Sequence, residues 1–203
     1  MEKTQTIITL AGFPAVGKTT TSIFIKKIKS TWDFYSTELS DVSKKDIQNL
    51  HRAKFIDYDK IQDIYITNLI QHANNIEKRY HSKILFLDRG FEDTLAVTNY
   101  FANNGLFNNY DTYKSKFISL LKKYFADITI FLYADLEVIK NRKMKRDVCL
   151  TENKRPDDDI FIKDISNFYM DWFKVNTNCI LLNTSNLEPI EVAQKIILIV
   201  EKK

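Results

Sequence analysis

The stretch from Thr6 to Thr20 constrains this chain more than any other. A β-branched, apolar run leads into the pattern Gly-x-x-x-x-Gly-Lys-Thr, and a helix-forming segment follows it. Glycines at both ends of such a loop allow dihedral angles and close approaches that a Cβ would block. Successive N–H groups then form a nest for phosphate oxygens at the positive end of the helix. The order of strand, glycine loop and helix therefore predicts a phosphate-binding loop of the Walker A type.

Two side chains of this loop have predicted roles in binding ATP and Mg²⁺. Lys18 can reach the β- and γ-phosphates of a bound ATP, and the Thr19 hydroxyl can ligate Mg²⁺. The alternative is a chance glycine turn, which the strand before the loop and the helix after it disfavour. The predicted ATP-binding residues of the loop are Gly12, Pro14, Ala15, Val16, Gly17, Lys18, Thr19 and Thr20.

Length and composition favour one compact domain over residues 1–203. The chain has 203 residues, of which 44% are hydrophobic, and this is enough for one well-developed core. The net charge of +4 comes from interspersed basic and acidic residues, so no DNA partner is expected. Because only residues 1–5 precede the first expected strand, no signal peptide is expected. No apolar run approaches the roughly 20 residues that span a bilayer. We expect a cytoplasmic protein without a membrane partner, and a homodimer stays open.

Strand-like and helix-like segments alternate along the chain. This alternation predicts an α/β fold in which helices cover both faces of a five-stranded parallel sheet. One long segment, residues 47–80, is expected to be mostly helical. The expected strands are the run before the glycine loop and residues 33–37, 84–87, 127–133 and 179–183.

A buried strand, residues 84–87, ends at Asp88 and Arg89. A carboxylate beside a phosphate loop is costly to bury without a cation. Asp88 is therefore a candidate Mg²⁺ ligand together with Thr19. The alternative is a structural ion pair between Asp88 and Arg89.

Acidic residues follow the second expected strand. Ligands of parallel sheets bind beyond the carboxyl ends of the strands, so Glu38 and Asp41 are candidate contacts of a phosphoryl acceptor. The alternative is that these acids cap the next helix, because Ser40 and Ser43 lie among them. Tyr65, on the helical segment that follows, is a further acceptor candidate.

Five cations lie within residues 140–146, just before a long irregular stretch. Arg142 and Arg146 are four residues apart, so they share one face of a helix. A lid over residues 140–159 would carry these arginines to the phosphates and exclude water. The alternative is an ordinary solvated basic face.

Other classes of phosphate-loop protein fit less well. A GTPase needs Asp-x-x-Gly, and none of the four glycines has Asp three residues before it. The chain is also too short for a motor. A kinase of small molecules remains.

Several stretches resemble one group of kinases. Residues 87–96 resemble the Asp-Arg-x-x-x-Ser-Ser-x-Ala stretch of thymidylate kinases, and residues 126–137 are similar to the strand that leads into their lid. Arg142 and Arg146 look like the paired lid arginines of thymidylate and deoxynucleoside kinases. Residues 169–172 look like a late helix of the deoxynucleoside kinases. Pro14 and Asp93 depart from the thymidylate kinase pattern, in which Asp and Ser are usual.

The resemblance implies a P-loop kinase-type three-layer sandwich and a set of roles. Asp88 would hold the magnesium shell or act as the base, and Arg89 would grip the phosphate or hydroxyl end of the acceptor. The loop of residues 183–186, with Ser185, would border the adenine. The implied catalytic residues are Lys18, Asp88, Arg89, Arg142 and Arg146, with Arg142 also an ATP contact.

Together these features predict an ATP- and Mg²⁺-dependent kinase of a small acceptor. A nucleoside or a nucleoside monophosphate is the preferred acceptor. One alternative is a kinase of another metabolite, an antibiotic or a nucleic-acid end. A second is a nucleotide-binding regulatory protein without catalysis.

Overall fold

A five-stranded, all-parallel sheet forms the centre of the computed structural model, which describes residues 5–107, 109–124, 126–147, 158–175 and 178–202. The strand order is β2-β3-β1-β4-β5. The predicted α/β fold class and parallel sheet are therefore confirmed. The strands are β1 (Thr6–Gly12), β2 (Asp33–Ser36), β3 (Ile84–Asp88), β4 (Ile128–Tyr133) and β5 (Cys179–Asn183).

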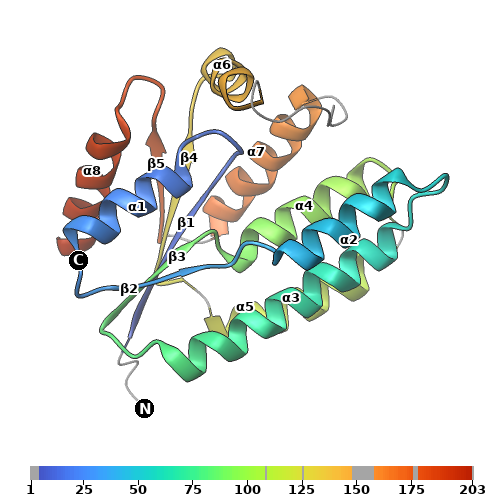
Figure 1. The fold of residues 1–203 in the computed structure, drawn as a ribbon, viewed down its shortest axis with the longest axis horizontal. Coiled ribbons are helices and arrows are strands. Elements are labelled where there is room, and N and C mark those ends of the chain that lie inside the picture. Colours follow the sequence, from blue (N-terminus) through green and yellow to red (C-terminus); the bar gives the residue numbers. More distant parts are fainter. Residues whose placement is uncertain (1–4, 108, 125, 148–157, 176–177, 203) are drawn as a thin grey trace.

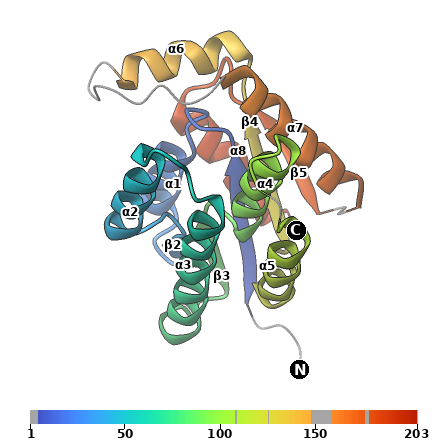
Figure 2. The same cartoon turned by 90° about the vertical axis from the view of Figure 1, so that its right-hand side faces the viewer.

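Strand β1 lies in the middle of the sheet and sends alternate side chains to opposite faces. Ile8 packs in the core with Ile25 and Ile196, whereas Ile7 packs with Leu69 on the other face. Both faces are therefore covered by helices, as Figures 1 and 2 show. The helices are α1 (Lys18–Ile28), α2 (Asp41–Arg52), α3 (Tyr58–Arg79), α4 (Phe91–Asn103), α5 (Tyr110–Tyr124), α6 (Leu136–Asp147), α7 (Asp158–Val175) and α8 (Pro189–Glu201).

The register brings the carboxyl ends of the three central strands to one edge of the sheet. Leu10 of β1 pairs with Asp88 of β3 and with Ile130 of β4. The glycine loop after β1 therefore lies beside the residues that follow β3. This edge is where parallel sheets bind ligands.

Residues 47–80 are mostly helical, as predicted, but they do not form a single helix. The structure has two helices there, because α2 ends at Arg52 and the Asp57 side chain starts α3 by accepting a hydrogen bond from the N–H of Lys60. Of the predicted lid, residues 140–147 belong to the end of α6 and residues 158–159 to the start of α7. Residues 148–157 lie outside the described residues.

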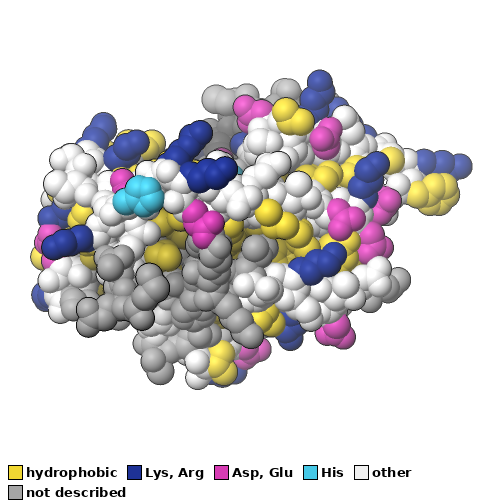
Figure 3. Space-filling view, turned by 90° about the horizontal axis from the view of Figure 1, so that it is seen from below, with side chains coloured by type: hydrophobic (Ala, Val, Ile, Leu, Met, Phe, Trp, Pro, Cys, Tyr) yellow, Lys and Arg dark blue, Asp and Glu magenta, His cyan; other side chains and the backbone are white. Residues whose placement is uncertain are grey.

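The face seen from below in Figure 3 mixes basic and acidic side chains with small hydrophobic groups. This agrees with the interspersed charges of the sequence. None of the helices in the described part of the chain is long and apolar enough to cross a membrane.

Candidate functional site

The loop between β1 and α1 has the backbone of an anion-binding nest. Gly12 has a φ of 140°, Ala15 of 67° and Gly17 of 99°. A Cβ on Gly12 would lie 2.2 Å from the carbonyl oxygen of Leu132, so the neighbouring strand β4 requires glycine there. Gly17 is the N-cap of α1 in the left-handed region, which favours glycine. The loop therefore ends at a helix N-terminus, where N–H groups without helical partners can bind phosphate.

Lys18 folds back over this loop. Its Nζ donates to the carbonyl oxygens of Gly12 and Phe13, at 2.6 and 2.8 Å. Burial lowers the pKa of the Lys18 ammonium to about 8, while the charge of Asp93 is the largest effect in the opposite direction. An anion placed in the nest would offer this buried ammonium a stronger partner than the two carbonyls.

A cavity of about 670 Å³ opens in front of the loop, and we call it the loop cavity. Arg142, from α6, lies on its wall together with residues from the start of α8. Glu38 and Arg89 line it from the β2–β3 side of the sheet. The predicted residues that line it include Thr184, from the loop of residues 183–186, and the glycine-loop residues Pro14, Ala15, Val16, Gly17, Lys18, Thr19 and Thr20. The lining residues that the sequence did not predict are Phe13, Thr21, Leu187, Glu188, Pro189 and Val192.

Asp88 is buried at the end of β3, close to Thr19. The Thr19 hydroxyl donates to its carboxylate, while Oδ1 of Asp88 has no hydrogen-bond partner. Burial raises the pKa of Asp88, and the neighbouring Arg89 and Lys18 charges oppose this shift. A hydroxyl and a buried carboxylate oxygen without a partner are suited to a hard divalent cation such as Mg²⁺. Thr19 and Asp88 therefore fit the predicted metal site.

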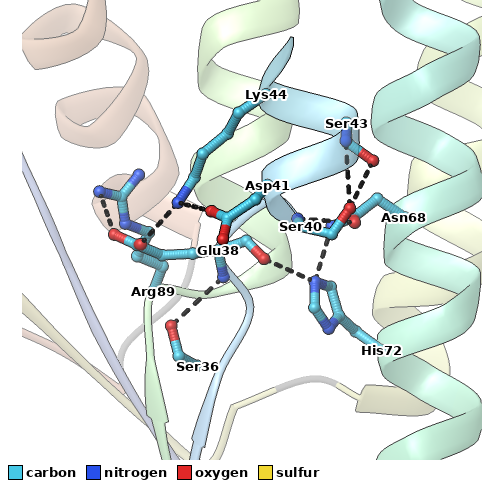
Figure 4. A network of polar contacts seen from close by, with 9 residues as sticks. All are labelled: Ser36, Glu38, Ser40, Asp41, Ser43, Lys44, Asn68, His72 and Arg89. Carbon is cyan, nitrogen blue, oxygen red and sulfur yellow. Dashed lines mark hydrogen bonds and ion pairs between the residues drawn. The ribbon is translucent and has the colours of Figure 1, made fainter. Parts of the chain in front are cut away.

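Arg89 takes a strained backbone conformation and forms an ion pair across the sheet edge. Its φ is 74°, in the left-handed region that side chains other than glycine rarely adopt. Its N–H donates to Leu10 O at 3.0 Å, and its carbonyl accepts from the Thr37 hydroxyl at 3.1 Å. These bonds aim the guanidinium at Glu38, with 2.8 Å between Nη2 and Oε1 (Figure 4). Strain of this kind, about 1–3 kcal/mol, occurs mainly at functional sites.

The loop that carries Glu38 is fixed by a polar network (Figure 4). The carbonyl of Glu38 contacts Nε2 of His72 at 3.1 Å. Nδ1 of His72 in turn contacts the Tyr35 hydroxyl at 2.6 Å. Ser40 caps α2, because its Oγ accepts from the N–H of Ser43. Asp41 is the first residue of α2, and its exposed side chain pairs with Lys44. Of the two alternatives for this acidic pair, the structure places Glu38 at the loop cavity and Asp41 at the helix start.

Arg142 is held on the opposite side of the loop cavity. It donates to the carbonyl oxygen of Thr184 at 2.8 Å and to its hydroxyl at 3.2 Å. Thr184 is buried and lies 3.2 Å from the carbonyl oxygen of Val16, so it joins the β5–α8 loop to the glycine loop. The predicted contact Ser185 points elsewhere, since its hydroxyl accepts from the N–H of Asp135. Arg146 belongs to α6, and its side chain lies outside the described residues.

Tyr65 of α3 packs against the core beneath α3, α4 and α5. It is not among the described residues that line the loop cavity. The helical spacing of Tyr65 with other apolar residues already favoured this packing.

Two acidic residues at the start of α4 lie near the glycine loop, and the sequence did not predict this position for either of them. Asp93 accepts hydrogen bonds from the hydroxyl of the buried Tyr169 and from the backbone of Gly12. Glu92 is fully buried, and the Thr129 hydroxyl donates to its Oε1 at 3.3 Å. Tyr169 is 76 residues from Asp93 in the sequence, so spacing could not show this contact. The signal that could have pointed to these residues is the Asp88-Arg89 stretch, because the helix that follows it begins beside the glycine loop.

Comparison with known proteins shows the fold. No family model and no curated protein matches the sequence. A solved structure of thymidylate kinase from Candida albicans matches with a TM-score of 0.70 and 15% identity, over 98% of this chain and 92% of that one. Thymidylate kinase from Ehrlichia chaffeensis matches with a TM-score of 0.65 and 16% identity, over 99% of this chain and all of that one. The chain therefore has the fold of thymidylate kinases, as the resemblance in its sequence implied.

Proposed function

We propose that this protein is an ATP- and Mg²⁺-dependent kinase that phosphorylates a hydroxyl group of a small acceptor, with a nucleoside as the preferred class. The observation that carries the proposal is the loop cavity, in which a phosphate-binding loop faces the Glu38–Arg89 ion pair. One side of this cavity suits the triphosphate of a donor, and the other offers a carboxylate to an acceptor. The likeness in fold to thymidylate kinases supports a nucleoside-like acceptor.

The donor side would work through positioning and positive charge. The N–H groups of residues 15–19 would hold the phosphates, and Lys18 would exchange its two carbonyl partners for phosphate oxygens. Thr19 and Asp88 would hold Mg²⁺, which supplies positive charge to the β- and γ-phosphate oxygens when it is bound. Arg142 and Thr184 line the far end of the cavity, where the nucleoside part of ATP would lie.

The acceptor side favours a hydroxyl over a phosphate. The guanidinium of Arg89 is already neutralised by Glu38, so an acceptor phosphate would have to displace that carboxylate. A hydroxyl acceptor instead needs a base, and Glu38 is a carboxylate that Arg89 holds in place at the cavity. In this scheme Glu38 takes the hydroxyl proton while the acceptor oxygen bonds to the γ-phosphorus. The bond from that phosphorus to the β–γ bridging oxygen breaks, and ADP leaves.

The test is an acceptor screen that follows ADP formation. We expect nucleosides to give turnover above the ATP-only background, and nucleoside monophosphates to give less. Sugars and aminoglycosides in the same screen test the other acceptor classes. Faster turnover with a monophosphate would reverse the assignment of Arg89 and make it a phosphate-binding residue. ATP binding without turnover for any acceptor would indicate a regulatory protein.

A further inference from the structure

A second, smaller hollow lies beside the loop cavity, between α1 and strands β2 and β3. We call it the side recess. Its volume is about 170 Å³, and its lining includes Thr19, Ser22, Ser36 and Asp88, with Phe34 and Phe86 behind them. Thr19 lines both hollows, so the side recess begins where the triphosphate and its metal would lie.

Two buried polar atoms in this recess have no partner. Oγ of Ser22 and Oδ1 of Asp88 are both fully enclosed and make no hydrogen bond within the described structure. Both residues are 8% exposed. A buried polar atom without a partner costs about 1–3 kcal/mol. Two such atoms, on residues that line one hollow, therefore point to a polar occupant that satisfies both.

The lining favours the hydration shell of a divalent cation. Mg²⁺ keeps several of its waters in protein sites, and those waters donate hydrogen bonds outward, so they need acceptors. Asp88 Oδ1 would bind the cation, and Ser22 Oγ is an acceptor for one of its waters. Ser36 Oγ already accepts a bond from the N–H of Glu38 at 3.3 Å. A water needs about 30 Å³, so the side recess has room for several.

The position of Ser22 on α1 is consistent with this role. Ser22 lies three residues after Thr19, so the two hydroxyls share one face of the helix. Lys26, one turn further, also borders the recess, but it is exposed and its ammonium can turn to solvent. The metal-facing side of α1 therefore continues from Thr19 to Ser22.

We propose that Ser22 is a positioning residue for the divalent cation, holding a metal-bound water in the side recess. This inference rests on the proposed function, because it assumes that a magnesium–nucleotide complex binds at the loop. Ser22 lies outside the glycine loop pattern, and its role is to fix the cation on the β2–β3 side of the triphosphate. Outer groups of this kind typically change metal affinity by 10–100-fold.

The experiment compares ADP affinity in excess EDTA with ADP affinity in Mg²⁺, by calorimetry, for three proteins. The wild type should bind ADP more tightly with Mg²⁺. Ser22→Ala should bind ADP in EDTA as tightly as the wild type does. The increase in ADP affinity that Mg²⁺ gives should be about tenfold smaller in this variant. Ser22→Thr restores the hydroxyl and should recover part of that gain. A matched control is Ser115→Ala, since Ser115 is also a helical serine but bonds to the Asp111 carbonyl of its own exposed helix.

Manganese gives a second readout that does not depend on turnover. In the ADP complex, Ser22→Ala should raise the dissociation constant of Mn²⁺, measured by electron paramagnetic resonance, by a similar factor. An unchanged magnesium gain and unchanged Mn²⁺ affinity in Ser22→Ala, with normal ADP binding, would overturn this inference alone. A wild type that binds no ADP in either medium would overturn the proposed function as well.

Discussion

Nη2 of Arg89 lies 2.8 Å from Oε1 of Glu38, and this contact joins the residue after β3 to the loop after β2. Lys44 also approaches Glu38, at 3.5 Å from Oε2. The two side chains of the ion pair are 45% and 36% exposed, so solvent screens them and the pair adds little to stability. Its significance is geometric, because Arg89 fixes the direction of a carboxylate at the loop cavity.

The first prediction concerns Glu38 as the base. Glu38→Gln keeps the shape of the side chain but cannot accept the acceptor proton, so kcat should fall by about 10²–10⁴. ADP affinity should stay within a few-fold of the wild type. The control is Asp41→Asn, three residues further, whose exposed side chain should matter little. A Glu38→Gln enzyme with near-normal kcat would remove Glu38 from the chemistry.

Lys18 provides the second prediction. Lys18→Ala should fold and lose most of its turnover, because the ammonium stabilises charge on the β- and γ-phosphates in the transition state. The variant should also keep or gain thermal stability, since it no longer buries an ammonium whose pKa burial lowers to about 8. Circular dichroism and ADP formation measure the two effects. An undiminished acceptor-dependent rate in the folded variant would rule out the kinase proposal.

Arg142 provides the third prediction, and here the geometry changes the sequence-based expectation. The sequence predicted that Arg142 closes over the transferring phosphoryl group and contacts ATP, and the structure holds its guanidinium on Thr184. Arg142→Ala should therefore raise KM for ATP by more than it lowers kcat. Lys143→Ala, which removes a cation from the next position of α6, is the matched control. A decrease in kcat with an unchanged KM for ATP would show that Arg142 acts on the transferring phosphoryl group.

The fourth prediction concerns Glu92 and pH. Burial, with a smaller effect of Asp93, raises the pKa of Glu92 from 4.5 to about 7. The folded state therefore holds this proton at pH values where the unfolded chain has released it. The contribution of Glu92 to the free energy of unfolding should be largest below pH 4.5. It should decrease by about 3 kcal/mol in all as the pH rises through 7.

Glu92→Gln separates this effect from the other titrating groups. The amide is neutral at every pH, so the variant should lose that part of the decline and should be more stable than the wild type at pH 8. Urea unfolding at pH 5 and pH 8 measures both. Parallel pH profiles in the two proteins would show that Glu92 titrates normally in the folded state.

The sequence predicted best what depends on local pattern. The glycine loop, the five strands and the position of Asp88 at a strand end follow from short stretches of neighbouring residues. The break between α2 and α3 was missed, although the Asp57 cap that starts α3 is a local signal. Local hydrophobic spacing is nearly the same on both sides of that cap.

Contacts between distant segments were beyond the sequence. Thr184, rather than Ser185, faces the loop cavity because it is the first residue after β5, and only the register of that strand decides which neighbour turns inward. The Glu38–Arg89 pair likewise depends on β2 lying beside β3. Neither the orientation of Thr184 nor the Glu38–Arg89 ion pair can be predicted from the spacing of residues along the chain.

Gly12 and Lys18 would have different fates in a lineage that ceased to bind nucleotide. Gly12 faces the backbone of Leu132, so a substitution there disturbs the sheet whether or not a ligand is present. Lys18 is buried and costs stability without a phosphate, so drift would tend to replace it. A decaying copy of this gene should therefore keep the first glycine of its loop long after it has lost the lysine.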